Sequence, residues 1–231
     1  MAAGNNPYRA VITGDVVGSS LLSVEKRRTL PEVIRSVSDR LQENFSALPH
    51  PVEIFRGDSW QYLVNDPALS LRTALYFRAE VRSAMDVKDL DTRIAIGIGT
   101  IDFLPEGNLS GGDGPAFRLS GAALDSLDKR TRLAVAFPGA VKSNLTRALD
   151  VILTLLDQEC QRWTLRQSAS VSGALLDYTQ QEISRRCFGG EISQQAVAQH
   201  LQRAGWGPLE RVLDFYEWVL PQITAQDVER T

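Results

Sequence analysis

Apolar residues in the first half of the chain recur at strand spacing and at helix spacing in turn. The apolar run at residues 10–13, which precedes Gly14-Asp15, predicts a buried strand followed by a turn. Residues 31–48 carry apolar side chains at steps of three and four. This spacing predicts an amphipathic helix with Pro31 in its first turn.

Two β-rich runs, at 52–56 and 59–64, flank Gly57-Asp58 in the pattern of a hairpin. The same spacing rules predict five further elements: a helix at 67–85, a strand at 92–101, a helix at 116–127, a strand at 132–137 and a long helix at 140–163. A glycine-rich loop occupies residues 105–114, between the second of these elements and the third.

The strand at 92–101 has one bulky face and one very small face. Isoleucines at 94, 96 and 98 point one way, and Ala95, Gly97 and Gly99 point the other way. A face without side chains allows a close approach, so either a helix or a ligand must lie against it.

The order of the elements predicts an α+β fold. Residues 8–139 fit a ferredoxin-like or palm domain with βαββαβ order, residues 140–163 fit a connecting helix, and residues 164–221 fit an all-α domain. We expect the long helix either to join two chains in a homodimer or to pack on its own sheet.

The C-terminal part has the pattern of a helix-turn-helix. A short helix at 180–188 is followed by a glycine turn, and Ser193 is a strong N-cap for the next helix. That second helix exposes polar side chains that could read base edges in a DNA groove, namely Gln194, Gln195, Gln199 and Arg203. A plain helical bundle that makes protein contacts is the alternative.

Composition limits the possible partners. The net charge of the 231 residues is −3, and residues 160–231 hold seven arginines, no lysine and eight acidic residues, whereas a DNA-binding face is usually basic. Arginines 185, 186 and 203 could still cluster on one side. The two cysteines and two histidines lack zinc-site spacing, and no signal or membrane segment is present, so a cytoplasmic protein without a membrane partner is expected.

Two aspartates are candidate metal ligands. In the βαββαβ order the first and third strands are antiparallel neighbours, so Asp15, after the first strand, and Asp58, before the third, meet at one edge of the sheet. A pair of carboxylates completed by substrate phosphates is a typical Mg²⁺ (or Mn²⁺) site. Alternatively, each aspartate is a turn residue or an N-cap.

Small residues beside these aspartates suit a phosphate group. Backbone N–H groups at Val16, Gly18, Ser19, Ser20 and Gly57 could face an anion. The sequence therefore predicts that a nucleotide binds where the metal does.

Four segments resemble blocks of the class III nucleotide cyclases, in the same order: VITGDVVGSS, FRGDSWQ, RIAIGIGT and GPAFRLSG. Over Tyr8–Val219 the chain resembles the bacterial SatD family, which joins a palm-like domain to a C-terminal helix-turn-helix. The resemblance implies that Asp15 and Asp58 match the two metal aspartates of the cyclases.

The match fails at the residues that stabilise the cyclase transition state. Arg118 stands where the cyclases have an asparagine, and Ala122 stands where they have an arginine. Because phosphoryl chemistry needs cationic donors, Arg118 is the candidate catalytic residue. Alternatively, it is a surface side chain paired with Asp125.

These observations favour a two-domain cytoplasmic regulator, in which the palm-like domain binds a nucleotide with Mg²⁺ and the helix-turn-helix binds DNA. The alternative is a metal-dependent nucleotidyl cyclase or nucleotidyltransferase whose tail makes protein contacts. A palm domain that only dimerises is a third possibility.

Overall fold

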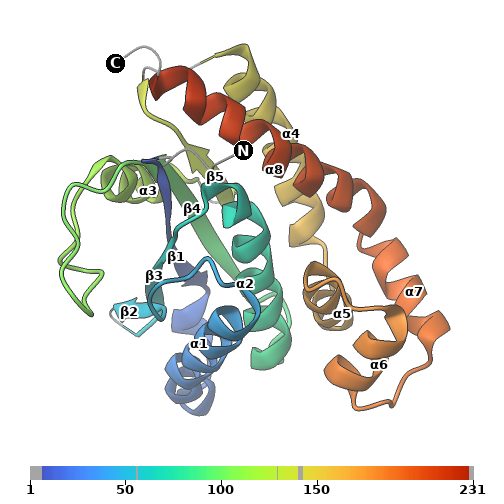
Figure 1. The fold of residues 1–231 in the computed structure, drawn as a ribbon. Coiled ribbons are helices and arrows are strands. Elements are labelled where there is room, and N and C mark those ends of the chain that lie inside the picture. Colours follow the sequence, from blue (N-terminus) through green and yellow to red (C-terminus); the bar gives the residue numbers. More distant parts are fainter. Residues whose placement is uncertain (1–6, 56, 129, 140–142, 229–231) are drawn as a thin grey trace.

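The computed structural model describes residues 7–55, 57–128, 130–139 and 143–228. Its centre is a five-stranded mixed sheet in the order β2-β3-β1-β4-β5 (Figure 1). The strands are β1 (Arg9–Val17), β2 (Glu53–Phe55), β3 (Ser59–Val64), β4 (Asp91–Gly99) and β5 (Leu133–Ala136). All neighbours are antiparallel except β4 and β5, which are parallel. The predicted α+β class and the pairing of the first strand with the third are confirmed.

Eight α-helices are present within the described residues. They are α1 (Val24–Asn44), α2 (Ser70–Met85), α3 (Pro115–Ser126), α4 (Asn144–Gln161), α5 (Leu165–Leu175), α6 (Gln180–Phe188), α7 (Gln194–Arg203) and α8 (Trp206–Val228). None of them is both long enough and apolar enough to cross a bilayer.

The first strand is longer than predicted and does not turn at Gly14. Its Gly14 pairs with Trp60 on one side and Ile94 on the other. A Cβ at this glycine would lie 2.4 Å from the Trp60 ring and 2.4 Å from the carbonyl oxygen of Arg93. The glycine therefore accommodates a close ring rather than a turn, and Asp15 lies inside the strand.

The first helix also starts earlier than predicted. Ser23 caps it by accepting a hydrogen bond from the N–H of Lys26, and Pro31 lies inside the helix instead of in its first turn. The buried stripe still has the expected spacing, since Ile34, Val37 and Leu41 are fully buried. The serine cap outweighs the proline in setting where this helix begins.

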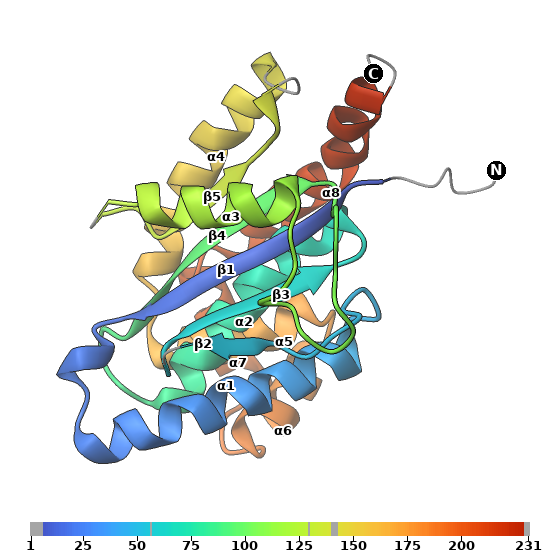
Figure 2. The ribbon, with the colours of Figure 1, turned by 90° about the vertical axis from the view of Figure 1, so that its left-hand side faces the viewer.

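Helix α3 covers the small face of β4, as Figure 2 shows. A Cβ at Gly97 would lie 2.2 Å from the carbonyl oxygen of Ala116, and one at Gly99 would lie 2.7 Å from the Ala116 nitrogen. Of the two predicted occupants of this face, a helix or a ligand, the structure shows the helix.

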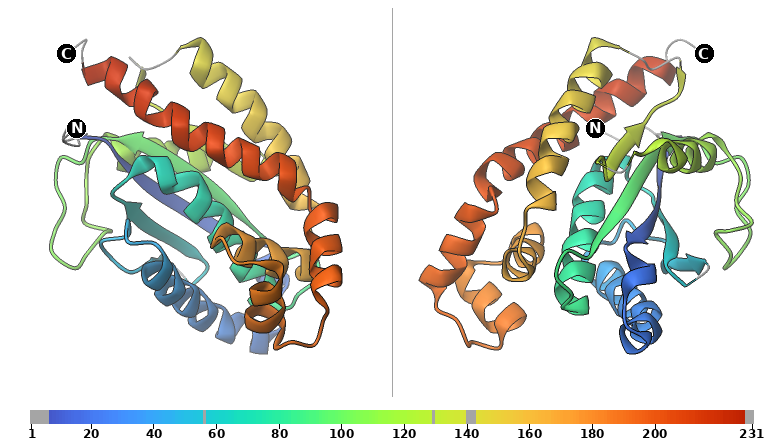
Figure 3. Two further views of the ribbon diagram at one scale, coloured as in Figure 1. Left: turned by 45° about the vertical axis from the view of Figure 1, so that its right-hand side comes forward. Right: turned by 180° about the vertical axis from the view of Figure 1, so that it is seen from behind.

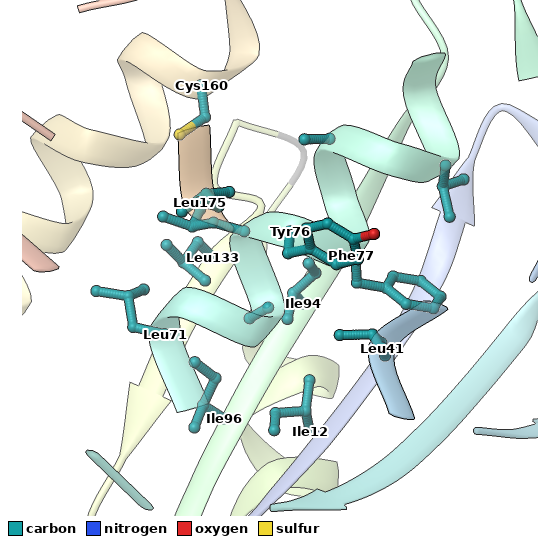
Figure 4. Packing of buried hydrophobic residues seen from close by; sticks show 14 of the residues in the cluster. Ile12, Leu41, Leu71, Tyr76, Phe77, Ile94, Ile96, Leu133, Cys160 and Leu175 are labelled. Carbon is teal, nitrogen blue, oxygen red and sulfur yellow. The ribbon is translucent and has the colours of Figure 1, made fainter. Parts of the chain in front are cut away.

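The opposite face of the sheet carries the main hydrophobic core. Helices α1 and α2 lie directly on it, and Phe77 of α2 packs on Trp60 at 4.0 Å between ring centroids. Figure 4 shows Ile94 and Ile96 of the sheet beside Leu71 of α2, with Leu175 from α5 close by. One continuous cluster of buried side chains extends from β1 to α8.

The C-terminal helices therefore share a core with the sheet. Helix α5 packs on α2, and α4 packs on both β5 and α8 (Figures 1 and 3). The Ser70 and Tyr216 hydroxyls are hydrogen-bonded at 2.8 Å, and Arg72 pairs with Glu217 at 2.6 Å. The predicted boundaries at 139 and 163 do not coincide with a gap in this packing.

Helix α4 is shorter than the predicted long helix, and residues 140–142 of that prediction lie outside the described part. Its inner side buries Leu149, Leu153 and Leu156, so it packs on its own sheet. Its outer side leaves Val151 and Leu155 61% and 68% exposed. The homodimer stays a prediction.

A buried ion-pair network joins the two halves of the chain. Arg78 of α2 donates to both carboxylate oxygens of Asp91, each at 2.8 Å, and to Asp157 of α4 at 2.8 Å. Arg132 donates to the same Asp91 at 2.6 Å, and Arg82 donates to the carbonyl oxygen of Cys160 at 3.1 Å. Both carboxylates and Arg78 are completely buried.

The close contact of β4 with α3 predicts a pair of opposite effects. Gly97→Ala should destabilise the protein by about 1–3 kcal/mol, because its methyl group would meet the backbone of α3. Gly121 lies in α3, and a Cβ at this position would meet nothing within 4 Å, so Gly121→Ala should stabilise the protein by about 0.5–1 kcal/mol. Urea denaturation of both variants measures the difference; equal effects would contradict the packing.

The buried network predicts a dependence of stability on pH. Burial opposes the ionisation of Asp91, but Arg78, Arg82 and the hydrogen bond from Arg132 outweigh it and lower its pKa to about 2. Its contribution is therefore complete above pH ~4 and is lost as the pH falls towards ~2.

Asp91→Asn should cost about 3–5 kcal/mol at neutral pH, because Arg82 and Arg132 lose this carboxylate and Arg78 keeps only Asp157. When denaturation is measured between pH 2 and pH 7, the free energy of unfolding should fall less with decreasing pH in this variant than in the wild type. The exposed Asp214→Asn is the matched control and should leave both properties unchanged.

Candidate functional site

A cavity of about 750 Å³ lies at the edge of the sheet where β1 ends and β4 begins. The strand register creates it, because Asp15 of β1 is directly opposite Arg93 of β4. Side chains two residues apart in a strand lie on the same face of the sheet. Asp15 therefore shares a face with Val11 and Thr13, and Arg93 shares one with Gly97, which is the face that α3 covers. The cavity is lined by Asp15, Val16, Val17, Gly18, Asp58, Ser59, Arg93, Leu127, Asp128 and Arg132.

Asp15 and Arg93 form a two-pronged ion pair in this cavity. The Nε atom of Arg93 donates to Oδ1 of Asp15 at 3.0 Å, and its Nη2 atom donates to Oδ2. The hydrogen bonds to Asp15 raise the pKa of Arg93 despite its partial burial. Both side chains keep some exposure, 20% for Asp15 and 36% for Arg93, so a ligand can reach them.

Asp58 lies in the β2–β3 hairpin and faces the segment that follows β1. The Ser19 hydroxyl donates to its Oδ2 atom at 2.5 Å, and the backbone N–H of Val16 donates to its carbonyl oxygen at 3.1 Å. These bonds hold the hairpin turn beside β1. The structure thus brings Asp15 and Asp58 into one cavity, as predicted.

Two carboxylates in one cavity fit a Mg²⁺ ion that is completed by phosphate oxygens. They do not form a closed protein site, because no group of three potential ligands occurs among the described residues. The third carboxylate of the cavity, Asp128, accepts the backbone N–H groups of Arg130 and Thr131 at 2.7 and 2.6 Å. Those two bonds lower the pKa of Asp128 and keep its side chain in its own turn.

The predicted phosphate-binding residues divide into two groups. Val16 and Gly18 line the cavity, whereas Ser19, Ser20 and Gly57 do not. The N–H of Val16 is already bonded to Asp58, and the Ser19 hydroxyl to its carboxylate. Gly18 has a left-handed backbone, with φ of 77°, and starts the short 3₁₀ turn Ser19–Leu21.

Arg118 lies away from this cavity. It ion-pairs with Asp113 at 2.6 Å and Asp102 at 3.2 Å, at the base of the glycine-rich loop, and not with Asp125 as the alternative expected. It is near the N-terminus of α3, whereas the cavity includes Leu127, just beyond the C-terminus of that helix. A catalytic role for Arg118 stays a prediction.

The cavity contains two cations that the sequence analysis did not select. Arg93 could have been found, since it shares the small face of its strand with Gly97 and Gly99. Arg132 precedes β5 and is held by Asp91, to which its side chain donates at 2.6 Å, and by Asp157, which accepts its backbone N–H at 2.7 Å. No sequence pattern predicted those contacts.

The predicted DNA-reading residues lie on the exposed surface of α7. Gln194, Gln195, Gln199 and Arg203 are all exposed, while Val197 and Leu201 of the same helix are buried. Ser193 caps α7 by accepting from the N–H of Ala196, as predicted, and α6 ends in the left-handed Gly189. Helices α6 and α7 pack on α5, so the expected helix, turn and helix are present.

The chain was compared with protein families, curated proteins and solved structures. No family model matches it, and no curated protein matches it. A solved structure, the crystal structure of the guanylyl cyclase Cya2, aligns with 50% of this chain and 70% of its own, at 13% identity and a TM-score of 0.34. This likeness is too weak to carry an argument.

Proposed function

We propose that the cavity of Asp15 and Asp58 binds the phosphate groups of a nucleotide together with Mg²⁺. The observation that carries the proposal is that the carboxylates of Asp15 and Asp58 line one cavity with two guanidinium groups, which belong to Arg93 and Arg132. Carboxylates attract the cation, and arginines are suited to bind phosphate oxygens.

In this proposal Asp15 and Asp58 hold the metal, and it neutralises charge on the phosphates. Arg93 lies on Asp15 and lines the same cavity, so it offers a guanidinium group beside the bound phosphates. Gly18 lines the cavity without a side chain, and its left-handed backbone favours glycine at this position.

We further propose that the C-terminal helices bind DNA through α7, so that the protein acts as a nucleotide-dependent regulator. The exposed glutamines at the start of α7 support this, since glutamine pairs with adenine edges in the major groove. The acidic balance of residues 160–231 argues for weak non-specific binding and for two copies engaging two half-sites.

The alternative is an enzyme, a nucleotidyl cyclase or nucleotidyltransferase. It needs a cationic donor on the phosphate undergoing transfer, and Arg93 is better placed for this than Arg118. Formation of a product from labelled nucleoside triphosphates would favour this alternative.

The metal proposal predicts the behaviour of Asp58→Asn. In the wild type, Mg²⁺ should tighten the binding of a non-hydrolysable nucleoside triphosphate in calorimetry. The variant should lose that enhancement by about tenfold or more, because loss of outer-shell partners alone costs about 10–100-fold.

Asp39→Asn, an exposed change on α1, is the control and should keep the enhancement. A folded Asp58→Asn protein that still gains affinity from Mg²⁺ would exclude this site. Lower stability with an unchanged metal effect would make Asp58 purely structural.

The DNA proposal predicts an enriched sequence when genomic fragments are selected on the protein. Gln194→Ala with Gln195→Ala should weaken that site by about thirtyfold or more, because two base contacts of ~1–3 kcal/mol each are lost, and should leave background binding unchanged. Gln222→Ala on α8 is the control. A selection that enriches no sequence, with and without nucleotide, would show that α7 is not a DNA reader.

A further inference from the structure

A second cavity, of about 930 Å³, lies where the α4–α5 turn faces α7 and the loop after α2. We call it the cationic groove and define it by the basic side chains that line it together with His200: Lys88, Arg132, Arg162, Arg166 and Arg203. These residues come from four separate parts of the sequence, because Arg162 and Arg166 lie at the same α4–α5 turn. Their convergence is a product of the fold.

Most of these cations have no carboxylate partner. Within the described part of the chain, Lys88, Arg166 and Arg203 form no ion pair, and Arg162 has only a 3.5 Å contact with Glu159 of its own helix turn. The one carboxylate residue among the lining residues described is Asp89. Like charges placed together without counterions are unfavourable, so an anion would stabilise them.

The surroundings of His200 are also positively charged. Its Nδ1 atom lies 3.3 Å from the Ser170 hydroxyl, and its ring is half-buried against the groove. Burial lowers the pKa of His200, and Arg166 and Arg203 lower it further. An anion in the groove would oppose both arginines.

The inner wall of the groove adds a buried cation. Arg82 is 5% exposed, and its Nε atom has no hydrogen-bond partner in the described residues. Burial lowers the pKa of Arg82. Asp91 acts in the opposite direction, and the neighbouring Arg78 and Arg132 lower the pKa further. Arg82 is paired with the buried Asp91 at 3.3 Å, so it forms part of the wall of the groove and is not one of its unpaired cations.

The shape of the groove decides which anion fits. Its volume is in the range of pockets for small ligands. Of the four residues predicted to read DNA, Gln194, Gln195 and Gln199 do not line it, whereas Arg203 does. Arg166 and Arg203 both line it, and both act on His200.

We propose that the cationic groove binds a compact phosphorylated ligand, such as a nucleotide or a polyphosphate, through Lys88, Arg166 and Arg203. This site is separate from the Asp15 and Asp58 cavity and goes beyond the proposed function. Arg132 lines both cavities, so occupants of the two would share one guanidinium group.

Histidine NMR tests the proposal directly, with inorganic tripolyphosphate as the probe and EDTA present to keep metal out of the first cavity. The chain has only two histidines, and His50 does not line the groove. Saturating probe should raise the pKa of His200 by about one pH unit and leave that of His50 in place.

Paired variants locate the site. Arg166→Gln with Arg203→Gln should weaken tripolyphosphate binding by about tenfold or more in calorimetry, since two charge-assisted contacts are lost. The matched control, Arg185→Gln with Arg211→Gln, removes the same charge from exposed positions outside the groove and should bind as the wild type does. Asp58→Asn should also bind normally in EDTA, which separates this site from the first.

Three results would overturn the proposal. They are no shift of His200 at saturating probe, equal weakening in the two double variants, and a His200 shift with a short DNA duplex but not with tripolyphosphate. The last result would assign the groove to the nucleic-acid backbone.

Discussion

Arg78 is fully buried, and its two carboxylate partners come from opposite halves of the chain, Asp91 at the start of β4 and Asp157 in α4. A charge in such a place must be paired and hydrogen-bonded, so the C-terminal helices have to dock on α2 in one position. The docking in turn places Arg132, which is bound to both carboxylates. Both cavities include this arginine, and so both depend on the network around Arg78.

Much of the fold follows from local patterns. The alternation along 92–101 predicted both the strand and the helix that could cover its small face, and Ser193 marked the start of α7. Errors occurred where a distant contact overrode a local preference. Gly14-Asp15 looks like a turn, but the Trp60 ring occupies the space beside Gly14, and the strand pairing continues through both residues. Pro31 looks like a helix start, but the helix already begins after Ser23, whose side chain caps it with a hydrogen bond.

The candidate site was only partly predictable for the same reason. Strand order was enough to bring Asp15 and Asp58 together. The pairing of Asp15 with Arg93 required the exact register, and the contacts of Arg118 with Asp102 and Asp113 depend on how a glycine-rich loop folds back. The cationic groove lies beyond any sequence pattern, because Lys88, Arg166 and Arg203 meet only after three elements have docked. The net charge of the chain gave no sign of the groove either, because a chain that is acidic as a whole can still have several basic side chains close together in one cavity.

The hydroxyl pair of Ser70 and Tyr216 spans most of the sequence and has a consequence for biosynthesis. A ribosome releases the N-terminal half first. At that stage the side of α2 that will contact α5 and α8 faces water, and Arg78 lacks Asp157. Native contacts of such long sequence separation form slowly. The nascent chain therefore exposes an adhesive surface until α8 has emerged, and a product that stops short of α8 keeps that surface exposed.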